Sequence, residues 1–134
     1  MNKELRKFFT GFLPAALLFA GACLDPGPCA GAAAPPLVLT LTVEGSITPF
    51  TWYQVKNAVA RAEKERARCL VLLLDTPGGL LASTRKIVQE IFASEVPVVC
   101  YVSPKGAQCA SAGTFIALAS HVAAMAPATT CSSM

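Results

Sequence analysis

Residues 69–75 form the run CLVLLLD, in which six apolar residues precede an aspartate. An uncharged run of this length is typical of a strand buried on both faces, as in a parallel sheet. After the turn TPGG, apolar side chains recur at spacings of three and four over residues 80–94, which predicts a helix. A strand, a tight turn and an amphipathic helix begin a βαβ unit, so this segment favours an α/β protein.

The same alternation extends on both sides of this segment. Apolar and β-branched runs predict further strands at 37–43, 97–102 and 121–127, and helical spacing predicts further helices at 49–66 and 111–120. Strands that alternate with helices run parallel and are joined by right-handed crossovers. We therefore predict one α/β domain with a mostly parallel sheet over residues 37–134.

The first part of the chain differs from this domain. Three basic residues precede about fifteen apolar or small ones, and the triplet AGA at 20–22 fits a signal-peptidase site. We interpret residues 1–22 as a bacterial-type signal peptide, or as an N-terminal membrane anchor where it is retained. The protein is therefore expected to be exported across the cytoplasmic membrane or anchored to it, and Cys23 also allows lipoprotein processing. Residues 23–36 are rich in Pro, Gly and Ala and predict a linker.

Charge and cysteine spacing argue against several classes of protein. Three of the eleven basic and one of the eight acidic residues lie in the signal, so eight and seven remain, a net charge of +1 that implies no nucleic-acid surface. No CxxC or Cys/His spacing typical of zinc is present, and neither a metal nor an organic cofactor is expected. Cys69 and Cys100 lie in apolar runs and are interpreted as packed small hydrophobes, whereas Cys23 and Cys29 flank a turn and are able to pair.

Two loops at the carboxyl ends of predicted strands are candidates for chemistry. DTPGG at 75–79 follows the first apolar run, and the loop ending at Ser111 follows strand 97–102, so both open on the same edge of the sheet. The adjacent Gly78 and Gly79 allow close approach and present N–H groups to a developing negative charge, as in an oxyanion hole. The alternative is a tight turn without a catalytic role.

Ser111 is the candidate nucleophile. Its neighbours Ala112 and Gly113 are small enough to admit a substrate carbonyl, and the amides of the following helix favour an anion. The alternative is that Ser111 is only a helix N-cap, for which a serine before an apolar run is well suited. Cys109, two residues away, is a rival nucleophile.

A serine needs a base to accept its proton, and the bases in this chain are poorly placed. His121 follows Ser111 by ten residues, which along a helix is about 15 Å, so it is assigned to structural packing. Lys105 and Lys86 are assigned to solvated surface.

Together, LLLDTPGGLLASTRKIVQEI and PVVCYVSPKGAQCASAGTFIALASHVAAMAP closely resemble the membrane-bound serine proteases of the NfeD type, in the ClpP class. The resemblance covers residues 37–127, and DTPGG with GAxxASAGT at this spacing is specific. It implies a ClpP/crotonase-like fold in which Ser111 is the nucleophile. The residues expected around it are Gly78, Gly79 and Ala112 in the oxyanion hole, and Leu80 and Gly113 in substrate binding.

The resemblance also implies an activity, which is cleavage of hydrophobic segments of membrane-associated, stomatin-like proteins by a Ser-Lys dyad. The family's lysine lies some tens of residues beyond the serine, and this sequence stops at Met134 before that region. The chain is therefore expected to hold an incomplete protease domain, poorly stable and inactive by itself. The alternatives are a non-catalytic truncated remnant or interaction module, and a crotonase-like acyl-CoA enzyme, against which export argues. Self-association into a homo-oligomer is left open.

Overall fold

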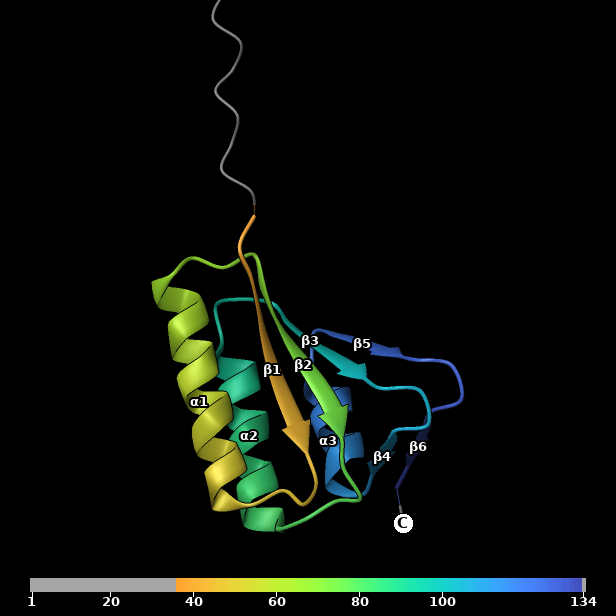
Figure 1. The fold of residues 1–134 in the computed structure, drawn as a ribbon. Coiled ribbons are helices and arrows are strands. Elements are labelled where there is room, and N and C mark those ends of the chain that lie inside the picture. The colour runs from red at the N-terminus through yellow and green to blue at the C-terminus, as the bar shows by residue number, and fades with distance from the viewer. Residues whose placement is uncertain (1–35, 134) are drawn as a thin grey trace, which may run out of the picture. The chain divides into compact units, whose positions relative to one another are not determined.

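The computed structural model describes residues 36–133. The predicted signal or anchor at 1–22, the linker up to residue 35 and the pair Cys23 and Cys29 lie outside the described residues. Figure 1 shows the described part as a parallel sheet with helices packed beside it. In chain order its elements are β1 (Val38–Glu44), α1 (Pro49–Lys64), β2 (Cys69–Asp75), α2 (Leu81–Ala93), β3 (Val98–Val102), β4 (Gln108–Ala110), α3 (Ala112–Ala119), β5 (Val122–Met125) and β6 (Thr130–Ser132).

The seven predicted helices and strands are all present, with ends that differ from the prediction by no more than two residues. α1 begins where the sequence indicates, because Thr48 and Thr51 form a capping box and Pro49 occupies the first turn. β4 and β6 were not predicted. Each has only three residues, too few for an alternating pattern to be recognised.

The main sheet has the strand order β1-β2-β3-β5, and every neighbouring pair is parallel, as predicted. β4 and β6 pair in a separate two-stranded parallel sheet. The parallel arrangement places the carboxyl ends of β2 and β3 at one edge, and the candidate loops leave from there.

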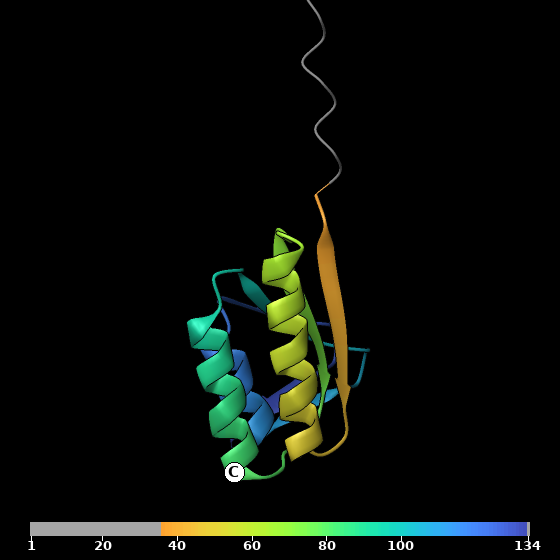
Figure 2. The same cartoon turned by 90° about the vertical axis from the view of Figure 1, so that its left-hand side faces the viewer.

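One face of the main sheet carries the core. Leu70, Leu72 and Leu74 of β2 are at most 1% exposed and pack in the same cluster as the inner faces of all three helices. Figure 2 shows α1 and α2 beside the orange strand β1, with α3 in blue behind the two helices. The prediction that β2 is buried on both faces is wrong, since its alternate residues are only half-buried. The sequence does not reveal this, because the half-buried residues of β2 are mostly apolar as well. No described helix covers the face on which they lie.

Among residues 36–133, no helix is long and apolar enough to cross a membrane.

Candidate active site

Backbone hydrogen bonds join the end of β2 to β4, the strand that leads into Ser111. The Thr76 amide donates to the Gln108 carbonyl (2.7 Å), and the Ala110 amide donates to the Thr76 carbonyl (2.9 Å). The Asp75 carboxylate adds a further link, because it accepts from the Gln108 amide at 2.9 Å. The sequence predicts that the two loops share an edge, and the structure shows that β4 holds them together.

Gly78 lies directly against Ser111. Its φ of +122° belongs to a conformation that side chains rarely adopt, and a Cβ there would sit 3.0 Å from the Ser111 Cβ. Thr76, which is fully buried, holds this turn through its hydroxyl, which accepts from the Gly78 amide (3.1 Å) and contacts the Gly78 carbonyl (3.2 Å). Glycine is therefore needed at 78 for both backbone conformation and space.

Gly79 is required for a different reason, since a side chain there would collide with the backbone of Ile47. Ile47 donates its amide to the Gly78 carbonyl (2.8 Å) and accepts from the Leu80 amide (2.9 Å), so a bridge of two hydrogen bonds fixes the turn from the β1 side. Within residues 36–133 the Gly79 amide donates no hydrogen bond, whereas the Gly78 amide is bonded to Thr76. Gly79 is thus the member of the pair whose N–H is available to a ligand.

Ser111 has the geometry of a strained residue and not that of a helix cap. Its φ of 49° and ψ of −106° lie far from the extended angles of an N-cap, and its hydroxyl makes no capping hydrogen bond to α3. Its amide donates to the Ser132 carbonyl of β6 at 2.8 Å, which helps to hold the conformation. The side chain is partly exposed. Ser111 therefore occupies the N-cap position of α3 without capping the helix through its side chain, and backbone strain of this kind is common at active sites and at the turns that present nucleophilic serines.

The first turn of α3 borders the serine. The amides of Ala112 and Gly113 begin the helix, where N–H groups have no intrahelical acceptor and attract negative charge. Gly113 is buried, and a side chain there would strike the Thr76 methyl group. Close packing against Thr76 thus explains this glycine, and its contact with substrate stays a prediction. Leu80 is 56% exposed just before α2, where its role in substrate binding also stays a prediction.

The candidate bases of the sequence are occupied elsewhere. Lys86 Nζ lies 4.3 Å from the centroid of the Trp52 ring, on the outer surface that α2 shares with α1. His121 Nδ1 accepts a hydrogen bond from the Val98 amide (3.1 Å) at the start of β3, the end of the sheet opposite the site. Lys105 is exposed in the turn before β4. No contact with Ser111 is formed by any of the three.

Cys109 is a poor rival to Ser111. It is fully buried beneath the site, and burial together with the neighbouring Cys131 raises its pKa, so the nucleophilic thiolate is scarce at neutral pH. Cys100 is also fully buried, as predicted for a small hydrophobe, and burial raises its pKa to about 12. Cys69 is half-buried on β2. In the described part of the chain, no group of three or more His, Cys, Asp or Glu residues is arranged to hold a metal ion.

Sequence reasoning overlooked Thr76 and Ile47. Thr76 belongs to DTPGG, so its place in the motif was a usable signal, but only the glycines were considered. Ile47 lies in the turn GSITP, where nothing in the sequence indicates that its backbone meets Gly79.

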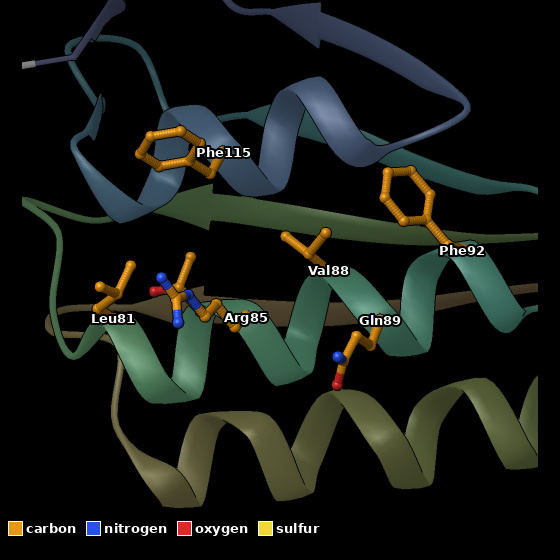
Figure 3. Close-up of a pocket in the computed structure, with 7 residues that line it drawn as sticks. Leu81, Arg85, Val88, Gln89, Phe92 and Phe115 are labelled. Atoms are coloured by element: carbon orange, nitrogen blue, oxygen red, sulfur yellow. The ribbon is translucent and has the colours of Figure 1, made fainter.

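An apolar groove of about 490 Å³ lies between α2 and α3 (Figure 3). Leu81 stands at the start of α2, shortly after the glycine pair, and Phe115 lies one turn after Ser111 in α3. One end of the groove therefore lies beside the first turns of α2 and α3. Its lining residues are Leu81, Thr84, Arg85, Val88, Gln89, Phe92 and Phe115.

A parallel sheet with a strained serine before a helix and a glycine turn packed against that serine defines the class of ClpP-like α/β folds. ClpP1 from Listeria monocytogenes shares this fold, with a TM-score of 0.55 at 21% identity over 60% of this chain and 46% of that one. Within the class, the chain belongs to the family of NfeD1b N-terminal domains, whose model matches residues 37–134.

Relatives in this family include the membrane-bound protease PH1510 of Pyrococcus horikoshii, which is 45% identical over 93 residues, or 69% of this chain and 21% of the relative. The solved structure of its 1510-N protease, specific for a stomatin homolog, has a TM-score of 0.71 at 43% identity and covers 75% of this chain and 50% of that one. A lysine-to-alanine variant of the stomatin-specific 1510-N protease, bound to a substrate peptide, also has a TM-score of 0.71 at 43% identity, over 74% and 45% of the two chains. This chain thus spans about a fifth of the curated relative and about half of these solved chains.

Proposed function

We propose that this chain supplies the nucleophile and oxyanion hole of a serine endopeptidase that cuts hydrophobic segments of membrane-associated proteins. The observation that carries the proposal is Ser111 itself. Its backbone is strained, its hydroxyl does not cap the helix, and it lies against the glycine turn. A residue kept only for packing or capping gains nothing from these angles, whereas a nucleophile does, because they present its hydroxyl to a substrate.

Each neighbour of Ser111 has a role in this proposal. The Ser111 Oγ attacks the substrate carbonyl carbon, and the carbonyl oxygen becomes negatively charged. The free Gly79 amide and the Ala112 amide at the start of α3 stabilise that charge. Gly78 packs directly against Ser111, where a side chain would crowd the nucleophile. The amine product leaves, and water then hydrolyses the acyl-serine.

The base in this proposal is a lysine supplied by a further part of the protease domain, forming a Ser-Lys dyad. A lysine accepts the serine proton only in its neutral form, which needs a partly desolvated site. Lys86 and Lys105 are exposed in this structure and do not meet that need. We therefore expect residues 1–134 alone to be inactive.

The substrate class follows from the apolar groove beside the serine and from the relative's specificity for a stomatin homolog. A hydrophobic segment of a stomatin-like membrane protein would lie along exposed side chains such as Leu81 and Phe115. Membrane association through residues 1–22, by export or by anchoring, would bring the protease to such substrates. Self-association stays a prediction.

A chimera tests the proposal. Residues 36–127 are joined to the part of the PH1510 protease domain that follows its matched region, which supplies the rest of that domain. The chimera is expected to react with a fluorophosphonate probe at Ser111 and to cleave a hydrophobic peptide, and Ser111→Ala should abolish both. A folded chimera that neither reacts nor cleaves would contradict the assignment and favour a non-catalytic module. Labelling of Ser111 in the 134-residue chain alone would instead refute the need for an added lysine.

A further inference from the structure

Two cysteines are paired on neighbouring strands next to the candidate nucleophile. Cys109 of β4 and Cys131 of β6 are direct partners in the register of the two-stranded parallel sheet. Neighbouring strands lie about 4.8 Å apart, which is within the Cα separation of about 4.4–6.8 Å that disulfides span. The backbone separation of paired strands therefore falls within the range that a disulfide spans.

Both sulfur atoms lie beside the first turn of α3. A Cβ built on Gly113, in the first turn of α3, would lie 3.2 Å from the Cys109 Sγ. The Cys131 Sγ lies 3.6 Å from the hydroxyl of Thr114, the next residue of that turn. That hydroxyl also contacts the Cys109 and Ser132 carbonyls, each at 3.0 Å, so it bridges the strands that carry the two thiols.

We propose that Cys109 and Cys131 are a modification site, which a small-molecule disulfide oxidises to a reversible cross-link between β4 and β6. Cys131 is exposed and reacts first. Its thiolate attacks the small-molecule disulfide, forms a mixed disulfide and releases one thiolate. Cys109, whose raised pKa makes this the slow step at neutral pH, then loses its proton and attacks the Cys131 sulfur, which releases the second thiolate. Overall, two protein thiols become one disulfide, and the small-molecule disulfide takes up both electrons and both protons as two thiols.

The cross-link acts on the backbone of Ser111. The Ser132 carbonyl, next to Cys131, accepts the Ser111 amide at 2.8 Å and the Thr114 hydroxyl at 3.0 Å. A covalent bond at Cys131 keeps this carbonyl in place when β6 would otherwise separate from β4. β6 has only three residues, all exposed, and pairs only with β4 among the described strands, so without the bond it separates easily. Oxidation thus holds the strained serine in its observed conformation.

The test uses the full 134-residue chain with Cys23 and Cys29 replaced by serine, incubated with oxidised glutathione or with dithiothreitol. Non-reducing peptide mapping is expected to find the Cys109–Cys131 cross-link after oxidation. Because the bond closes the segment that holds α3 and β5, the midpoint of thermal unfolding should rise by about 10–20 °C. Hydrogen exchange of the Ser111 amide should become slower. None of these measurements needs hydrolytic activity, so failure here is distinct from failure of the proposed protease.

Matched variants separate the cross-link from other thiol chemistry. Cys131→Ser changes an exposed side chain and should abolish the cross-link, the rise in midpoint and the slower exchange. Cys69→Ser should retain all three. The proposal is overturned if Cys100 is the preferred partner of either thiol, if no 109–131 peptide forms, or if the oxidised and reduced chains have the same midpoint.

Discussion

Replacing Ser111 by glycine and, separately, by alanine distinguishes a strained nucleophile from a helix cap. The φ of 49° and ψ of −106° at this position are costly for a residue with a side chain, by about 1–3 kcal/mol. Glycine removes that strain, but its freer unfolded chain costs about 0.5–1 kcal/mol. Ser111→Gly is therefore expected to stabilise the protein by about 0.5–2 kcal/mol.

Alanine keeps the strain and removes only the hydroxyl. Because that hydroxyl forms no capping bond to α3, Ser111→Ala is expected to change stability by less than about 0.5 kcal/mol. A true N-cap would behave differently, since loss of a serine cap costs about 1 kcal/mol in alanine and only a few tenths in glycine.

Urea unfolding of the 134-residue chain and its two variants, followed by circular dichroism, measures these differences. One kcal/mol corresponds to a shift of about 4–8 °C in the midpoint of thermal unfolding for a domain of this size, so a thermal scan provides a second reading. The reasoning is refuted if Ser111→Ala loses 1 kcal/mol or more while Ser111→Gly remains close to the parent.

Three further predictions concern the surroundings of the site. Gly79→Ala should lower the free energy of unfolding in urea by roughly 2–4 kcal/mol, because the added methyl group meets the Ile47 backbone. The control Gly45→Ala has open space but a φ of +77°, so it should cost only about 1–2 kcal/mol. Equal losses in the two variants would contradict the packing argument. Thr76→Val removes the buried hydroxyl that holds Gly78, so it should lower the free energy of unfolding by about 1–3 kcal/mol and slow cleavage by the chimera. Unchanged stability and an unchanged cleavage rate would show that the turn holds without this hydroxyl. Burial raises the pKa of Cys100 from 9.0 to about 12, so the unfolded chain loses this proton at a lower pH than the folded chain. The free energy of unfolding should therefore fall by up to roughly 4 kcal/mol as pH rises from about 9 to 12. Cys100→Ala should reduce this fall, and an identical pH dependence of parent and variant would refute the prediction.

The sequence predicts most of this fold because its main elements are long and regular. The helix at 80–94 carries a helical period, and the runs at 69–75 and 97–102 are short, continuous and apolar, as buried strands are. β4 and β6 escape prediction because three residues show no period, and their pairing depends on segments far apart in the chain. The burial of β2 was misjudged because an apolar run shows that both faces of a strand can be buried. It does not show which face the helices cover.

The candidate site was predictable in location but not in detail. The edge of the sheet and the residues involved follow from strand order and from DTPGG with ASAGT. A serine before an apolar run is equally compatible with a cap and a nucleophile, and the sequence does not reveal that the Ser111 side chain makes no capping hydrogen bond. Likewise, two adjacent glycines look alike in sequence, although the hydroxyl of Thr76 engages one amide and leaves the other free.

The hydrogen bond between the Ser111 amide and the Ser132 carbonyl also affects the order of events during synthesis. The ribosome completes α3 and β5 before it makes β6, so the main sheet is able to assemble while the serine still lacks this partner. Ser111 then acquires its final shape only after the chain has passed through a further helix and strand and returned to β4. The backbone of Ser111 is thus completed by a partner that is made only after residues 112–131 have been added.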